Sequence, residues 1–138
     1  VDVQCQHLRT VGQVIAEASI DTPAEYMQEM YNEYLERRNY LIEGLNKIPG
    51  VYSAVPMGAF YTVARLPIDD SDKFCAWLLS EFEYEKQTVM MAPASGFYTM
   101  KNVGCNEVRL AYVLNKEDLE KALFILKKAL EVYPGRTK

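Results

Sequence analysis

The sequence predicts a two-layer α/β sandwich of the α+β kind, with a small mixed β-sheet, helices packed on one of its faces and a long N-terminal helix before it. Apolar residues recur every three to four positions in several segments and alternate with polar residues in others, and turn residues separate the two patterns. With 138 residues, of which 49% are hydrophobic, the chain has the size of a single domain, 1–138.

The N-terminal part of the chain is expected to be helical. Residues 1–20 form a first segment with a short helix over 10–19. A second, longer helix is expected within 21–47, because Thr22-Pro23-Ala24-Glu25 has the form of a capping box and Pro49-Gly50 ends the apolar pattern. At roughly 24 residues this helix would be about 36 Å long. Such a length is unusual for so small a domain and suggests that the helix once bridged to something else.

Residues 51–138 are expected to form the α/β core. Short alternating runs predict strands, and runs at helical spacing that follow Asp, Ser or Asn predict helices. In order, we expect strands at 51–55 and 59–66, a helix that follows the several N-caps offered by Asp69-Asp70-Ser71 and runs to about Tyr84, strands at 88–91 and 107–114, and a helix after Asn115. Within 59–66, alternation places Phe60, Thr62, Ala64 and Leu66 on one face, and Ala59, Tyr61, Val63 and Arg65 on the other.

The composition of the chain argues against several classes of binding partner. The formal net charge is -4 and no basic block exists, which argues against a nucleic-acid partner. No apolar run approaches the roughly 18–20 residues of a membrane span, so no membrane partner is expected. Cys5, Cys75 and Cys105 lie far apart, which suggests neither a metal site nor a disulfide framework. Reduced thiols in a cytoplasmic protein are the expected state.

Three stretches could carry chemistry, although each also has an ordinary structural explanation. Arg109 stands inside an apolar strand, where it could face solvent or, if partly covered, grip a carboxylate with its planar fork of donors. Gly58-Ala59-Phe60-Tyr61 is either a turn before core aromatics or a binding loop. The stretch 93–98 is either a plain connection or part of a site.

Together and in this order, these stretches resemble one family. The motifs are Pro-Met-Gly-Ala-Phe-Tyr at 56–61, Val-Met-Met-Ala-Pro-Ala-Ser-Gly-Phe-Tyr at 89–98 and Asn-Glu-Val-Arg-Leu-Ala-Tyr-Val at 106–113. From about Ile15 to the end, the sequence is similar to the C-terminal, small domain of class I/II, fold-type I aminotransferases that depend on pyridoxal phosphate. The resemblance is closest to bacterial aspartate aminotransferases, which transfer an amino group between an amino acid and a 2-oxo acid.

The resemblance implies roles for particular residues. In this family the arginine of the Val-Arg-Leu motif, here Arg109, binds the α-carboxylate of the substrate. The Gly-x-Phe stretch lies near the substrate, which points to Gly58, Ala59 and Phe60. The Pro-x-Ser-x-Phe loop lies at the mouth of the active site, which makes Ser95 and Phe97 further substrate-binding candidates. The long helix resembles the one that joins the large and small domains.

The resemblance also implies what this chain does not supply. Family members bind the cofactor through a lysine in a Ser-x-x-Lys motif, but no serine here is followed three residues later by lysine. That lysine and the rest of the cofactor site belong to the large domain, the implied partner of this one. We therefore expect no catalytic, cofactor-binding or metal-binding residue here, no pyridoxal phosphate bound to the isolated chain and no activity from it. The full-length enzyme would be a homodimer.

Two other classes of function remain open: a stand-alone α/β module that binds an amino-acid carboxylate through Arg109, and a purely structural or interaction domain. Exposed apolar surface separates them from a domain that packs on a partner. A domain of that kind should expose apolar side chains of the long helix at Tyr26, Met27, Met30 and Tyr34, whereas a self-sufficient module should not.

Overall fold

The computed structural model describes residues 3–100 and 102–137, with side chains described from Thr10 onward. The chain divides into two compact units, Val1–Glu33 and Tyr34–Lys138. The boundary between the units falls inside the helix Ala24–Asn46.

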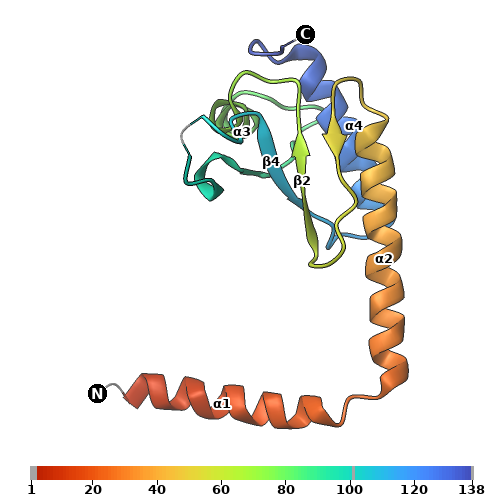
Figure 1. Cartoon of the computed structure of the whole chain (residues 1–138), viewed down its shortest axis with the longest axis vertical. Coiled ribbons are helices and arrows are strands. Elements are labelled where there is room, and N and C mark those ends of the chain that lie inside the picture. Colours follow the sequence, from red (N-terminus) through yellow and green to blue (C-terminus); the bar gives the residue numbers. More distant parts are fainter. Residues whose placement is uncertain (1–2, 101, 138) are drawn as a thin grey trace. The chain divides into compact units, whose positions relative to one another are not determined.

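The first unit is helical. It holds α1, Val3–Ile20, and the beginning of α2, Ala24–Asn46 (Figure 1). The bounds of α2 agree with those expected from the capping box and from Pro49-Gly50. The helix expected over 10–19 is longer than predicted, because the residues before Val11 lack an apolar period and yet include good helix formers. The described side chains of this unit are exposed except that of Thr22.

The second unit is built around a four-stranded sheet. Its strands are β1 (Tyr52–Ser53), β2 (Tyr61–Arg65), β3 (Ala92–Pro93) and β4 (Glu107–Ala111), in the spatial order β1-β2-β4-β3. Each pair of neighbours is antiparallel, so the predicted α/β architecture is confirmed but the predicted mixed sheet is wrong. The crossover through α3 (Ser71–Ser80) leaves β2 and β3 running in one direction, but β4 lies between them and opposes both.

Helices cover one face of this sheet, as predicted. Alternate residues point inward, so that Thr62 and Ala64 of β2 and Val108 of β4 are buried, and Figure 1 shows α4 (Lys116–Val132) behind β1, next to β2. We call the other side the open face; it carries Tyr61, Val63, Arg65, Glu107, Arg109 and Ala111.

The core lies between the sheet, the C-terminal half of α2, α3 and α4. Two predicted N-caps fix the helices that cover it. The carboxylate of Asp70 accepts a hydrogen bond from the backbone N–H of Lys73 at 2.9 Å, and the side-chain oxygen of Asn115 accepts one from Asp118 at 2.8 Å. The largest buried side chains include Leu45, Leu66, Phe74, Leu78, Tyr112, Leu126 and Leu130.

Several predicted elements have other bounds in the structure. The strands expected at 51–55, 59–66 and 107–114 are shorter, at Tyr52–Ser53, Tyr61–Arg65 and Glu107–Ala111. The helix expected to reach Tyr84 stops at Ser80, with Glu81 as its C-cap. Tyr84 instead pairs with Gln87 across a tight turn in which Glu85 and Lys86 adopt positive φ angles of 52° and 62°. The strand expected at 88–91 is displaced to Ala92–Pro93. The Thr88 hydroxyl donates to the carbonyl of Leu78 at 2.7 Å, which ties this stretch to α3 and not to the sheet. Pro93 is tolerated because β3 is an edge strand.

In the described part of the chain, three features concern possible partners and redox state: the apolar length of the helices, groups of metal-binding side chains and the state of the cysteines. None of its helices is both long and apolar enough to cross a membrane. Its His, Cys, Asp and Glu side chains form no group of three or more suited to a metal ion. Cys75 and Cys105 are free, and the side chain of Cys5 lies outside the described residues.

Candidate functional site

The candidate site lies on the open face, where β2 and β4 pair. Val63 lies opposite Arg109 and Arg65 lies opposite Glu107, so the pairing brings two arginines and one acid onto the same surface. Directly opposed residues on one face of an antiparallel pair lie close enough for their side chains to interact. The charges on this face are therefore arranged by strand register.

Arg109 is the group on this face that is available to an external anion. Its guanidinium carbon lies 5.3 Å from the ring centroid of Tyr61 and 5.0 Å from that of Phe97. Among the residues that the structure describes, none forms an ion pair with Arg109. Its N–H donors therefore remain available for a bidentate bond to a carboxylate.

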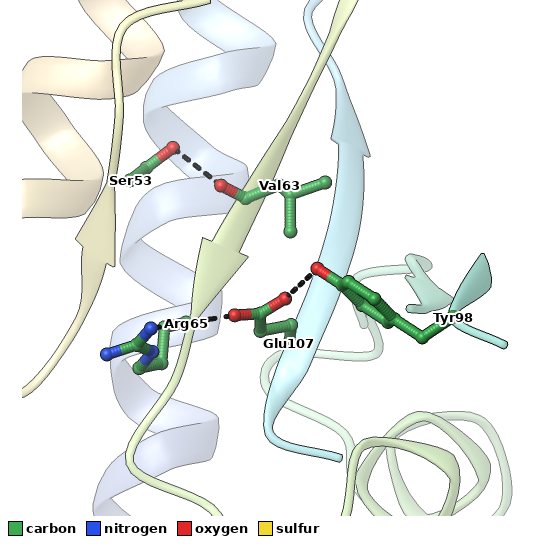
Figure 2. A network of polar contacts seen from close by, with 5 residues as sticks. All are labelled: Ser53, Val63, Arg65, Tyr98 and Glu107. Carbon is green, nitrogen blue, oxygen red and sulfur yellow. Dashed lines mark hydrogen bonds and ion pairs between the residues drawn. The ribbon is translucent and has the colours of Figure 1, made fainter. Parts of the chain in front are cut away.

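The nearby acid, Glu107, is engaged elsewhere. One of its carboxylate oxygens lies 3.7 Å from a guanidinium nitrogen of Arg65, and the other accepts a hydrogen bond from the Tyr98 hydroxyl (Figure 2). The Tyr98 ring lies against Gly104, where a Cβ atom would be 2.3 Å from the ring and where φ is +72°. Glu107 thus joins the 98–104 segment to the sheet and is not the counter-ion of Arg109.

The hydrogen bond to Glu107 should be visible in the titration of Tyr98. Because the carboxylate accepts from the phenol, the pKa of Tyr98 is raised above its ordinary value of 10.0. A raised pKa in the folded state means that the bond stabilises the fold below pH 10 and that this contribution is lost as the pH rises through the raised pKa. Burial also raises the pKa values of Tyr112 and Tyr133, so several phenols should titrate late, and Tyr98→Phe should remove one of them from a tyrosinate absorption titration.

The matched control for this titration is Glu107→Gln. Removing the negative charge while keeping the shape should move the pKa of Tyr98 back toward 10.0, since the carboxylate is the largest cause of the shift. An unchanged titration in Glu107→Gln would contradict the assignment of the bond.

The loop at Gly58, Ala59 and Phe60 lies just before the start of β2 and is held by its backbone. The Tyr112 hydroxyl donates to the carbonyl of Ala59 at 2.8 Å, and the Tyr112 N–H donates to that of Phe60 at 3.0 Å. Arg38 donates to the carbonyl of Pro56 at 3.1 Å. The loop is therefore ordered although its own side chains are exposed.

The structure adds two details about the side chains of this loop, and the first differs from what alternation predicts. Phe60 was expected to share the inward face with Thr62, but it is 56% exposed, because Ala59 adopts a positive φ of 63° and β2 begins only at Tyr61. Gly58 has open space at the position of a Cβ atom, so no contact within the described chain requires a glycine there.

The stretch 93–98 forms the 3-10 helix η1, Ser95–Phe97, in place of a plain connection. The Ser95 hydroxyl donates to the carboxylate of Asp72 at 2.6 Å, which ties η1 to α3 and engages this hydroxyl away from Arg109. Phe97 extends from η1 to the guanidinium of Arg109. Of the predicted site residues, the structure thus brings Arg109 and Phe97 into contact and leaves Ser95 in a supporting position.

The residue that the sequence analysis did not select is Tyr61. Its alternation with Val63 and Arg65 already placed it on the face opposite to Thr62 and Ala64. Knowing that β2 pairs with β4 would have added Arg109 to that face. The missing information was the strand register, which depends on contacts distant in sequence.

A cavity of about 470 Å³ lies elsewhere in this unit, on the helix-covered side of the sheet. It is bounded mainly by α4 and the 87–91 segment, with apolar side chains such as Met91, Leu110, Leu119 and Leu123. None of the predicted site residues lines it. We therefore place the candidate site at Arg109 on the open face and not in this cavity.

The apolar surface expected on α2 is present within the first unit. Tyr26 is 59% exposed, Met27 49% and Met30 38%. The fourth expected member, Tyr34, is half-buried against the core of the second unit. Large apolar side chains gathered in this way on a helix are typical of a surface that packs against another protein or domain.

Known proteins resemble most of this chain. Residues 5–126 match the family described as aminotransferase class I and II. The aspartate aminotransferase of Pyrococcus horikoshii is 36% identical over 107 residues, covering 76% of this chain and 25% of that enzyme. The aspartate aminotransferase of Bacillus subtilis is 30% identical over 129 residues, covering 88% and 30%.

Solved structures agree with the sequence relatives. The crystal structure of the aspartate aminotransferase from Thermotoga maritima superposes with a TM-score of 0.70 at 32% identity, covering 88% of this chain and 28% of that one. The alanine aminotransferase from Pyrococcus furiosus gives a TM-score of 0.66 at 27% identity, covering 80% and 27%. The chain spans about a quarter of the length of the curated relatives that it matches.

Proposed function

Because the chain belongs to the class I and II aminotransferase family, we propose that it is the C-terminal, small domain of an aspartate aminotransferase-like enzyme that depends on pyridoxal phosphate. In this proposal residues 1–138 act as one domain, and 21–47 contain the helix that joins it to the large domain. The whole enzyme transfers an amino group between an amino acid and a 2-oxo acid.

The observation that carries the proposal is Arg109 on the open face, with no ion-pair partner in the described part of the chain and two aromatic rings beside it. The proposed role of its guanidinium is to hold the α-carboxylate of the amino acid by two parallel hydrogen bonds and so to orient the substrate amine. Gly58, Ala59 and Phe60 are proposed to line the substrate pocket, with Phe97 at its mouth and Ser95 behind it.

The residues described here do not fit a site for pyridoxal phosphate. That cofactor provides an electron sink when it is bound to a lysine, and the lysine must be reactive. Among the described lysines, five lie in ion pairs with carboxylates: Lys47, Lys73, Lys116, Lys121 and Lys128. We propose that the cofactor belongs to the large domain, and no chemical step is assigned to it within this chain.

The proposed partners follow from the same reasoning. The exposed apolar side chains of α2 support packing against a large domain, since such a surface costs free energy when it faces water. The match to about a quarter of each relative agrees with a partner that supplies the remainder. A homodimeric full-length enzyme is part of the proposal, as is a cytoplasmic location, which the free thiols of Cys75 and Cys105 support.

The alternative of a stand-alone carboxylate-binding module is less well supported. A self-sufficient module should bury the apolar side chains of its long helix, and Tyr26, Met27 and Met30 are exposed. A purely structural domain gives no reason for an arginine that lies between two rings and has no ion-pair partner among the described residues.

A chimeric enzyme tests the proposal. In the Pyrococcus horikoshii aspartate aminotransferase, the segment similar to this chain is replaced by this chain, and transfer from L-aspartate to 2-oxoglutarate is measured. We expect activity together with the absorption of bound pyridoxal phosphate. A folded chimera that holds the cofactor but does not transfer the amino group would contradict the proposal.

The isolated chain provides the complementary test. Mixed with pyridoxal phosphate and reduced with borohydride, it should show no stoichiometric label at a single lysine in peptide mass mapping. One lysine labelled to completion would overturn the assignment of the cofactor site to another domain.

A further inference from the structure

Arg109 lies between two aromatic rings that come from different parts of the fold. Tyr61 is the first residue of β2 and Phe97 is the last residue of η1, and the guanidinium carbon lies 5.3 and 5.0 Å from their ring centroids. Both distances are within the roughly 6 Å over which a cation is attracted to a ring face. Two such contacts restrict the guanidinium more than either would alone.

The restriction matters because an arginine side chain is long and has many rotamers. A mobile arginine loses that freedom when it binds a ligand, and this loss weakens binding. Elsewhere on the open face the ordering comes from charge, since Arg65 lies 3.7 Å from Glu107. No such ion pair holds Arg109 in the described part of the chain, so its ordering depends on the rings.

Unlike an ion pair, contacts with aromatic rings leave the N–H donors of the guanidinium free. A ring attracts a guanidinium through its face, and it does not use the N–H donors at the edge of the cation in the way that a carboxylate does. Those donors are the ones that form a bidentate bond with a carboxylate ligand. The rings can therefore order Arg109 without occupying the groups that recognise the ligand.

Both rings are attached to ordered backbone. Tyr61 pairs with Ala111 in the ladder between β2 and β4. Phe97 donates its backbone N–H to the carbonyl of Ala94, which is 1% exposed, at 3.0 Å. The bond from Ser95 to Asp72 fixes η1 to α3 at 2.6 Å.

We propose that Tyr61 and Phe97 are positioning residues that preorganise Arg109 for the α-carboxylate of the substrate, and that Ser95 acts through Phe97. The substrate part of this inference rests on the proposed function. The ordering of the guanidinium is a property of the chain itself and can be measured without any activity.

The first measurement is the NMR signal of the Arg109 Nε–Hε group in the isolated chain, with Arg136 as an exposed reference. We expect the Arg109 signal to be shifted by ring currents and to fluctuate less than that of Arg136. Tyr61→Leu and Phe97→Leu should each make the Arg109 signal more like that of Arg136 in shift and mobility, while Tyr61→Phe should leave the Arg109 signal unchanged. Backbone amide spectra establish that each variant is folded. An Arg109 as mobile as Arg136, or one unaffected by both leucine variants, would overturn the proposal.

The second measurement is the kinetics of the chimera with L-aspartate. Each leucine variant should raise KM by about 2- to 5-fold at unchanged kcat, because a weak contact that positions bound substrate equally in ground and transition states is lost. Tyr61→Phe should restore KM, since the ring is retained. Unchanged KM values in an active chimera overturn the substrate role. An inactive parent chimera contradicts the proposed function instead, and the NMR signal then decides whether the rings order Arg109.

Discussion

Replacement of Arg109 by glutamine in the chimera is expected to lower kcat/KM for L-aspartate by about 30- to 4,000-fold. This range corresponds to the roughly 2–5 kcal/mol lost when one partner of a hydrogen-bonded charge pair is removed. Arg109→Lys should recover only part of the loss, because an ammonium group keeps the charge but not the planar fork that matches a carboxylate. Steady-state kinetics with varied L-aspartate measure both effects.

The matched control is Arg65→Gln on the same face of the sheet. Arg65 is paired with Glu107, and its side chain is 61% exposed, so its loss should change kcat/KM much less than the loss of Arg109. An equal reduction for the two variants would mean that the positive charge of the face matters and not the particular arginine. If Arg109→Gln left kcat/KM for L-aspartate unchanged, the proposed site would be wrong.

The sequence predicted the elements of this fold better than their pairing. The caps at Asp69-Asp70-Ser71 and at Asn115 were predicted because the capping oxygen and the helix that it caps are neighbours in sequence, and Asp70 is the cap that α3 uses. The sheet was expected to be mixed, but each pair of neighbouring strands is antiparallel. The placement of β4 between β2 and β3 depends on long-range packing, which local patterns do not specify.

In the candidate site, too, local sequence predicted individual residues but not the long-range contacts between them. Arg109 was selected because an arginine in an apolar strand is unusual, and Phe97 because of the motif around it. Ser95 was selected with Phe97, but its bond to Asp72 joins residues 23 positions apart and could not be read from the local sequence. Tyr61 was passed over for the same reason, since its contact with Arg109 exists only when β2 and β4 are in register.

Replacement of Phe74 by alanine is expected to have the largest effect on stability, lowering the free energy of unfolding by about 3–5 kcal/mol. Phe74 is 0% exposed, and its ring lies 4.8 Å from that of Tyr133 and 6.1 Å from that of Trp77. Removal of the ring leaves a cavity between α3 and the end of α4, and the neighbouring aromatic side chains lose contacts that a small residue cannot replace. Urea unfolding followed by circular dichroism measures the change.

Leu79→Ala is the control on the same helix, because Leu79 is 60% exposed and its truncation should change stability by no more than about 0.5 kcal/mol. Small domains are stable by only about 5–15 kcal/mol, so the loss at Phe74 is a large fraction of the total and would also reduce carboxylate binding at Arg109 by unfolding the sheet. For this reason Arg109 variants must be compared at equal folded fraction. A Phe74→Ala chain as stable as Leu79→Ala would show that the aromatic cluster does not support the sheet on which the proposed site is built.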